Sequence, residues 1–263
     1  MPLFSKTYHQ AASDQWVVFI HGAGGSSNIW RRQLTAFQQH FNLLTIDLRG
    51  HGKSTLFKTT SPYHFNLIIN DIITVLNTLD IEKAHFVGIS LGSLLSNLLA
   101  IKFLDRVSSL VLGGSISRIN IKARILLSVG NVFKKVIPFL WLYKIFATIV
   151  LPKKNHQESR RLFIKEAKRM DQEQFLKWFA LTSELPEVLR QLRTTLIVPP
   201  TIFIQGKEDH MFLQDLLKAP NSQKQTMKVI PNCGHVVNIE KPTLFNKMSI
   251  NFIQKVVRQL TVT

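Results

Sequence analysis

Short apolar runs alternate with segments of helical spacing along most of this chain, and this alternation constrains the fold more than any other feature. The runs are rich in Val, Ile, Leu and Phe, as expected of parallel strands buried on both faces. They cover residues 16–20, 41–46, 85–87, 109–112, 201–204 and 227–230, and helical segments at residues 29–39, 65–79, 91–103 and 243–260 separate or follow them. The alternation predicts an α/β fold, with helices on both faces of a mostly parallel central sheet.

The alternation stops between about residue 115 and residue 193, where helical spacing continues without a strand-like run. Because this stretch falls between two predicted strands, we interpret residues 115–195 as an inserted helical cap. Residues 1–114 and 196–263 then form the α/β core. A chain of 263 residues has the length expected of one such domain with one insertion.

The chain is strongly basic, with a net charge of +17 from 33 basic and 16 acidic residues. The predicted cap holds 16 of the basic and 6 of the acidic residues, a net of +10, which leaves +7 for the core. This balance fits nucleic acid, an anionic membrane, an acidic substrate or simply a solvated basic surface. No nucleic-acid-binding motif is present, so we expect no nucleic acid partner. Peripheral membrane contact through the basic cap stays open, as does the choice between monomer and homodimer.

Cysteine usage and hydropathy bear on location. The lone cysteine, Cys233, allows no internal disulfide and no cysteine metal cluster, and it favours a reducing compartment. The N-terminal residues lack the basic-then-apolar order of a signal peptide, so we predict a cytoplasmic protein. The longest apolar stretch, residues 136–151, contains Pro138 and Lys144 and is shorter than the roughly 20 residues that span a bilayer.

The strongest local motif is Gly88-Ile89-Ser90-Leu91-Gly92, between a predicted strand and a predicted helix. A serine on a sharp strand-to-helix turn projects its hydroxyl over the edge of the sheet, and flanking glycines relieve crowding there. The N-terminus of the following helix would stabilise an anion formed beside it. Ser90 is therefore a candidate nucleophile, although an ordinary glycine-rich turn would give the same pattern.

A serine hydroxyl needs a base to take its proton, and the base needs an acid to orient it. Asp209 follows the predicted strand at residues 201–204, and His235 follows the last predicted strand. Side chains just past the carboxyl ends of parallel strands meet at one edge of the sheet, so these residues can converge on Ser90. Glu208 is a rival acid, and either Asp209 or His235 could instead be an ordinary loop residue.

A glycine-rich loop, His21-Gly22-Ala23-Gly24-Gly25, follows the first predicted strand. Acyl transfer needs backbone N–H groups aimed at the developing oxyanion, and glycines let the backbone approach closely. We assign the two donors to the N–H groups of Ala23 and Leu91, and we expect His21 to be a structural hydrogen-bonding residue. A phosphate-binding loop is excluded because no Gly-Lys-Ser/Thr directly follows this glycine-rich loop.

These motifs together resemble the α/β-hydrolase fold superfamily over nearly the whole chain except the cap. The likeness rests on motifs in the family's order: His21-Gly22, Trp30, residues 47–54, the turn around Ser90, residues 206–209 and Gly234-His235. The resemblance implies a Ser90–Asp209–His235 triad, a sheet of about eight strands and a cap that roofs the site and selects the substrate. Ile89 stands where many members have histidine and Ser93 where many have glycine, which leaves the substrate open. The serine argues against the dehalogenase and epoxide-hydrolase branches, but a perhydrolase stays open.

The cap is apolar as well as basic, and several side chains could line an acyl pocket. We predict that Ile89, Phe139, Trp141, Trp178 and Val236 line it, with Phe133, Leu140, Tyr143 and Phe146 also available. The alternative for each cap residue is that it packs the cap onto the core.

The resemblance implies a hydrolase that cleaves a carboxylic ester of a small or lipid-like apolar substrate through an acyl-enzyme on Ser90, without a metal or cofactor. On the same triad, hydrolysis of a C–C bond, hydrolysis of a thioester, or an elimination as in menaquinone biosynthesis are alternatives. A further alternative is a ligand sensor of the same fold with little turnover. Fold alone does not decide among these functions.

Overall fold

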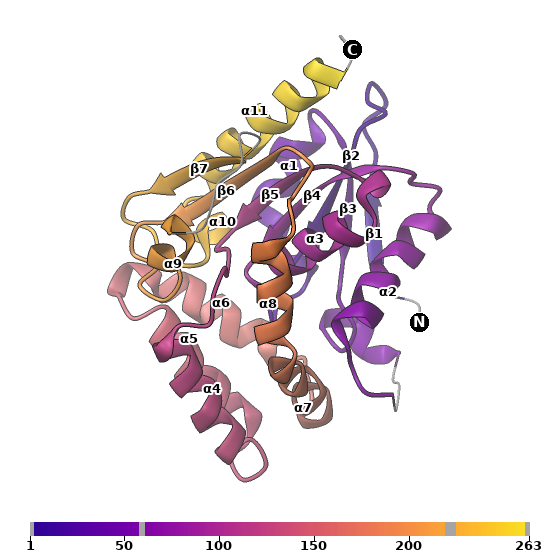
Figure 1. The fold of residues 1–263 in the computed structure, drawn as a ribbon. Helices are drawn as coiled ribbons and strands as arrows, with labels where there is room; N and C mark the ends of the chain where they lie inside the picture. The colour runs from indigo at the N-terminus through magenta and orange to yellow at the C-terminus, as the bar shows by residue number, and fades with distance from the viewer. Residues whose placement is uncertain (1–2, 58–60, 219–224, 261–263) are drawn as a thin grey trace.

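The computed structural model describes residues 3–57, 61–218 and 225–260, so residues 1–2 and 261–263 at the ends of the predicted core lie outside it. A seven-stranded sheet runs through the molecule in the order β1-β3-β2-β4-β5-β6-β7, and every neighbouring pair is parallel except β1 with β3 (Figure 1). The strands are β1 Ser5–Tyr8, β2 Trp16–Ile20, β3 Asn42–Ile46, β4 Ala84–Ile89, β5 Val107–Gly113, β6 Thr201–Gly206 and β7 Gln225–Ile230. The predicted α/β architecture is confirmed, with seven described strands against about eight expected.

All six predicted strands are present, and β1 is the strand that the sequence did not reveal. Its sequence, Ser-Lys-Thr-Tyr, contains no apolar run, because β1 is an edge strand whose residues are only partly buried or exposed. It pairs antiparallel with β3 alone, with Ser5 opposite Ile46. Periodicity therefore detects the buried parallel strands and misses this polar edge.

Helices cover both faces of the sheet, and neighbouring side chains along a strand divide between two apolar cores. Val18 and Ile20 of β2 point into the core under α2 and α3, whereas Val17 and Phe19 point into the core under α1 and α11. The core helices are α1 Arg31–Gln38, α2 Phe65–Thr78, α3 Leu91–Lys102, α9 Leu213–Leu217, α10 Val237–Glu240 and α11 Pro242–Leu260. Short 3-10 helices are η1 Ser27–Trp30, η2 Gly52–Leu56 and η3 Leu104–Arg106.

Five α-helices lie between β5 and β6 without an intervening strand, and they gather in the lower part of Figure 1. They are α4 Ile121–Phe133, α5 Phe139–Val150, α6 Gln157–Ala167, α7 Gln172–Ala180 and α8 Leu185–Thr194, with η4 Lys154–His156 and η5 Leu181–Ser183 between them. We call α4 to α8, with these two turns, the inserted helices. They lie within residues 115–195, the segment interpreted from the sequence as an inserted cap.

The inserted helices have a small apolar cluster of their own and are also anchored to the main core. Phe139, Tyr143 and Phe175 belong to the small cluster, whereas Leu181 and Leu189 pack into the core that holds α2 and α3. Among the described residues, no helix combines the length and the apolar character needed to cross a membrane.

Candidate active site

Ser90 occupies a strained turn between β4 and α3. Its φ of 54° and ψ of −113° are unusual for a residue other than glycine, and its N–H donates to the Gly113 carbonyl at 2.9 Å. The two flanking glycines are required by space: a Cβ on Gly88 would lie 2.3 Å from the Gly92 oxygen, and one on Gly92 would lie 2.0 Å from the Ile20 oxygen. The turn therefore has the sharp geometry that the sequence predicts.

The structure brings His235 and Asp209 to Ser90 in a continuous hydrogen-bonded series. His235 Nε2 is 2.9 Å from Ser90 Oγ, and His235 Nδ1 is 2.7 Å from Asp209 Oδ2. When Nδ1–H donates to the carboxylate, Nε2 presents its lone pair to the serine hydroxyl. The three residues follow β4, β6 and β7, so the carboxyl ends of three strands place them together.

The carboxylate of Asp209 is buried and held by further donors. Gln205 Nε2 donates to Oδ2 at 2.6 Å, and the backbone N–H groups of Met211 and Phe212 each donate to Oδ1 at 3.2 Å. These contacts fix the orientation of the oxygen that faces His235. Asp209 thus has the placement expected of an orienting acid.

The rival acid, Glu208, points away from His235 into a separate polar cluster. It accepts hydrogen bonds from Asn155 Nδ2 and Lys153 Nζ, each at 2.8 Å, and lies 2.9 Å from His156 Nε2. The hydrogen bonds from Asn155 and Lys153 hold the pKa of Glu208 at about 2. Neighbouring acids in the sequence thus have different partners, and the one beside His235 is Asp209.

The glycine-rich loop after β2 lies directly against Ser90. A Cβ on Gly22 would be 3.2 Å from the Ile89 oxygen and 3.4 Å from Ser90 Cβ. Ala23 and Leu91 line the same cavity as Ser90, and the Leu91 N–H is at the first turn of α3, where amides have no acceptor within the helix. Both residues therefore lie at the cavity that holds Ser90, and the role of their N–H groups as oxyanion donors stays a prediction.

Two buried histidines shape this loop. His21 Nε2 accepts from the Leu48 N–H at 3.0 Å and His51 Nε2 accepts from the Gly24 N–H at 2.8 Å. Burial lowers the pKa of both imidazoles, with His21 further lowering that of His51, so both rings stay neutral and can accept. His21 has the structural role that the sequence analysis expected, whereas the role of His51 was not foreseen.

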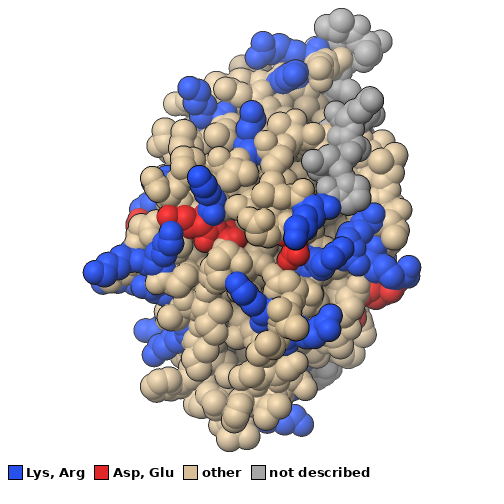
Figure 2. All heavy atoms as spheres, turned by 60° about the vertical axis from the view of Figure 1, so that its left-hand side comes forward, with Lys and Arg blue, Asp and Glu red and all other residues tan. Residues whose placement is uncertain are grey.

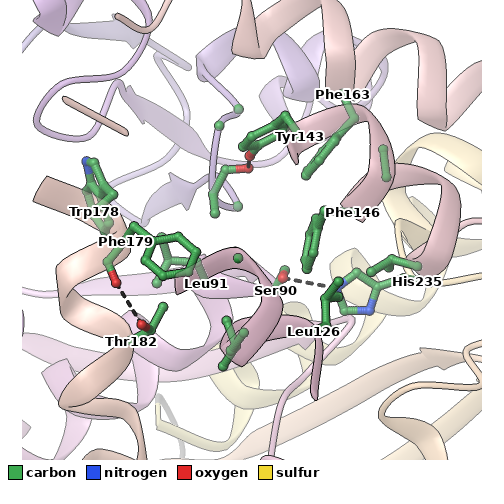
Figure 3. Close-up of a pocket in the computed structure, with 18 of the residues that line it drawn as sticks. Ser90, Leu91, Leu126, Tyr143, Phe146, Phe163, Trp178, Phe179, Thr182 and His235 are labelled. Atoms are coloured by element: carbon green, nitrogen blue, oxygen red, sulfur yellow. Dashed lines mark hydrogen bonds between the residues drawn. The ribbon is translucent and has the colours of Figure 1, made fainter. Parts of the chain in front are cut away.

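Ser90 opens into an apolar cavity of about 440 Å³ beneath the inserted helices. In Figure 3, Phe146 and Phe163 lie above Ser90 and His235, Phe179 lies to the left, and Leu126 lies beside His235; all four line the cavity. None of the described residues that line it is Lys, Arg, Asp or Glu. The cavity therefore presents hydrocarbon and aromatic surface with a small polar region at Ser90.

Three of the five predicted pocket residues line this cavity and two do not. Ile89, Trp178 and Val236 are at its wall, and Phe133, Tyr143 and Phe146 join them. The prediction is wrong for Trp141, which is 60 % exposed, and for Phe139, which packs against Phe175 with ring centroids 5.6 Å apart. Leu140 is likewise absent from the lining. Helical spacing places these residues on other faces of α5, which the sequence analysis could not orient.

A second polar cluster, which sequence reasoning missed, connects the inserted helices with the His235 loop. His156 Nε2 lies 2.9 Å from Glu208 Oε2 and 3.6 Å from Glu240 Oε2. Glu240 in turn accepts from the N–H groups of Gly234 at 2.7 Å and Val236 at 3.3 Å, the two neighbours of His235. Burial raises the pKa of Glu240. No local sequence pattern signals this cluster, because its members come from three separate segments.

Within the described residues, no three His, Cys, Asp or Glu side chains are grouped so that they could hold a metal ion.

Comparisons with known proteins agree with this architecture. The family model described as alpha/beta hydrolase fold matches residues 15–135. The curated 3-oxoadipate enol-lactonase 1 of Acinetobacter baylyi is 33 % identical over 103 residues, which are 39 % of this chain and 38 % of that protein. The chain thus spans about two fifths of this relative's length.

Solved structures match over almost the full length. The enol-lactonase from Burkholderia xenovorans superimposes with a TM-score of 0.77 at 21 % identity, over 96 % of both chains. A thermophilic esterase from Thermogutta terrifontis gives a TM-score of 0.79 at 19 % identity, over 97 % of this chain and 93 % of the other. The chain therefore has the α/β-hydrolase fold, and its residues 15–135 match the family model of that description.

Proposed function

We propose that this protein is a serine hydrolase that cleaves carboxylic esters with an apolar acyl group, through an acyl-enzyme on Ser90. The observation that carries the proposal is the hydrogen-bonded series from Ser90 through His235 to Asp209 at the floor of an apolar cavity. The catalytic roles of these three residues, and of the Ala23 and Leu91 amides, are part of the proposal. The enol-lactonases and esterases among the similar proteins support the same class of reaction.

In the first half-reaction, His235 Nε2 takes the hydroxyl proton as Ser90 Oγ attacks the ester carbonyl carbon. The carbonyl oxygen becomes an oxyanion that the N–H groups of Ala23 and Leu91 stabilise. The imidazolium then gives its proton to the alkoxide as the C–O bond breaks, so the alcohol leaves and the acyl group stays on Ser90. Asp209 holds the imidazole orientation and stabilises its charged form.

In the second half-reaction, a water molecule replaces the alcohol. His235 removes one of its protons while the hydroxide attacks the acyl carbon. The oxyanion collapses, the Ser90 oxygen leaves and recovers the proton from His235, and the carboxylic acid is released. No cofactor takes part in either half.

The lining of the cavity favours an apolar acyl group over a substrate with a free carboxylate. A buried carboxylate is costly without a charged or hydrogen-bonding partner, and the described lining supplies no Lys or Arg. Arg49, in the segment that follows β3, is buried and paired with Asp71 at 2.7 Å. This arrangement weighs against the alternative reading as a C–C hydrolase for anionic diketone acids.

The experiment is a substrate panel on the purified protein: p-nitrophenyl esters of increasing acyl length, matching thioesters, and anionic diketone acids. We expect kcat/KM to rise with acyl length up to the capacity of the cavity and to be lowest for the anionic acids. A strong preference for the diketone acids would overturn the ester assignment. Labelling by a fluorophosphonate with negligible turnover of every substrate would favour a ligand sensor.

A further inference from the structure

One face of α4 exposes an apolar stripe that the core does not cover. Ile121, Ile125, Val129 and Val132, with Val136 just beyond the helix, recur at intervals of four, four, three and four residues, which places them on one side. Their exposed fractions run from 48 to 80 %. Exposed apolar residues gathered in this way are typical of an interaction surface.

Helix α5 carries a second exposed stripe, and both stripes adjoin the active-site cavity. Trp141, Ile145 and Ile149 follow one another at intervals of four residues and are all exposed. Val129 of α4 and Ile145 of α5 are at once exposed and part of the cavity lining. The cavity therefore reaches the surface between these two helices, within the apolar area. We call the exposed residues of α4 and α5, with Val136, the α4–α5 face.

The chain segment that carries this face is basic. All six acidic residues of the segment 115–195 lie at or after Glu158, so residues 115–157 contain eight Lys and Arg and no Asp or Glu. In Figure 2 the lower part of the molecule shows tan surface broken by blue side chains and no red. Lys144 Nζ lies 5.0 Å from the ring centroid of the exposed Trp141. The face thus combines apolar side chains, an exposed tryptophan and flanking cations.

We propose that the α4–α5 face docks on a membrane surface that contains anionic lipids, with the mouth of the cavity turned toward the bilayer. Apolar side chains of such a surface enter the boundary between headgroups and acyl chains, and the cations pair with anionic headgroups. A second copy of this chain is a poor occupant, because two faces with the same positive charge repel each other. Docking does not require Ser90, so an experiment can overturn the docking proposal without affecting the proposed catalysis, and the reverse.

The test is sedimentation of the purified protein with vesicles of phosphatidylcholine, alone or mixed with phosphatidylglycerol. We expect strong binding to the mixed vesicles only, weakened by high salt because salt screens the charge attraction. The Ser90→Ala protein should bind equally. Binding to neither vesicle, or binding that ignores lipid charge, would overturn the proposal.

Substitutions on the α4–α5 face test whether it is the surface that binds the vesicles. The double variant Ile125→Asp/Val132→Asp should abolish binding to the mixed vesicles, whereas Leu196→Asp should bind like the wild type. Leu196 is a matched control, because it is 69 % exposed against 70 % for Val132 and lies beyond the inserted helices. Equal binding by the double variant, or equal loss in the control, would contradict the proposal.

The charge contribution is tested in the same way. Replacing Lys122 and Lys135 by Gln should weaken vesicle binding about fivefold per charge, whereas Lys247→Gln/Lys255→Gln on α11 should weaken it much less. All variants should keep the wild-type Tm and the wild-type turnover of a soluble short-chain ester. A dimer that forms in solution and is broken by Val132→Asp would show that a second copy covers this face, and would overturn the membrane assignment.

Discussion

Tyr143, on the inserted helix α5, donates a hydrogen bond from its hydroxyl to the carbonyl oxygen of Ala23 in the loop after β2. The N–H of Gly24 belongs to the same peptide unit and donates to His51 Nε2 at 2.8 Å. One peptide plane is therefore held at both ends, by an inserted helix on one side and by the core on the other. The Ala23 N–H, the proposed oxyanion donor, belongs to the adjoining peptide on the N-terminal side of this plane.

Removing the Tyr143 hydroxyl should weaken catalysis as well as folding. Tyr143→Phe leaves the Ala23 carbonyl without its donor, which costs about 1–3 kcal/mol, and we expect kcat to fall roughly tenfold while KM changes little. Steady-state kinetics on one p-nitrophenyl ester measures this. Tyr63→Phe is the matched control, since it removes a hydroxyl that donates to Gln174 within the inserted helices and does not line the cavity. Equal effects of the two substitutions would contradict the role of Tyr143.

Asp209 and Glu208 are adjacent in sequence, and substituting each in turn tests which acid orients His235. Asp209→Asn should lower kcat about 10⁴-fold, because the amide no longer favours the imidazole tautomer that leaves Nε2 free to accept the serine proton. Glu208→Gln should keep most of the activity, because Glu208 faces Lys153, Asn155 and His156. Both variants keep the side-chain volume. Loss of activity in Glu208→Gln with an active Asp209→Asn would show that the assignment of the acid is wrong.

The size of the cavity should set the acyl preference. Leu126 lines the cavity close to Ser90 and His235 (Figure 3), so Leu126→Trp should lower kcat/KM for long acyl chains about tenfold or more and leave short chains nearly unaffected. Ile125→Trp is the matched control on the same helix, because Ile125 is exposed and outside the lining. The measurement is the acyl-length profile in solution. A shift of the profile in the control, or none in Leu126→Trp, would argue against this cavity as the acyl site.

Acid should destabilise the fold through a buried histidine in β4. Burial, with a smaller contribution from Lys83, lowers the pKa of His85 to about 4 from 6.5. Above pH 6.5 the residue is neutral in both states and its contribution is constant. Between pH 6.5 and about 4 the unfolded chain binds the proton first, so the free energy of unfolding decreases as pH falls, by up to about 3 kcal/mol.

Urea unfolding at pH 7 and at pH 4.5 measures this loss. His85→Gln should be less stable at pH 7, because the ring bonds Ser109 at 2.7 Å, but it should lose less stability on acidification than the wild type. His21 and His51, whose pKa values are also lowered by burial, contribute in the same direction in both proteins. Parallel losses in wild type and variant would refute the role of His85.

The sequence predicts the parts of this molecule that depend on local patterns. Apolar runs indicate the buried strands, and all six strands predicted from them are present. The glycines around Ser90 indicate a sharp turn, and the strand ends place Asp209 and His235 beside it, as the structure shows. The sequence does not predict the edge strand β1, because its residues are mostly polar and it pairs on one side only.

The sequence could not show which face of a predicted helix meets the cavity. Helical spacing shows that α5 is apolar, but it does not show which face meets the cavity, so Trp141 and Phe139 were misplaced while Tyr143 and Phe146 line the wall. Contacts between distant segments, such as His156 with Glu208, leave no local pattern either.

The central claim is that Ser90 is the nucleophile, and acylation of the intact protein tests it most directly. The wild-type protein treated with a fluorophosphonate should gain the mass of one adduct, located at Ser90, and lose its esterase activity in step. Ser90→Ala should form no adduct, and its kcat on a short p-nitrophenyl ester should fall on the order of 10⁴-fold or more. Undiminished turnover by Ser90→Ala, or an adduct on another residue, would contradict the account.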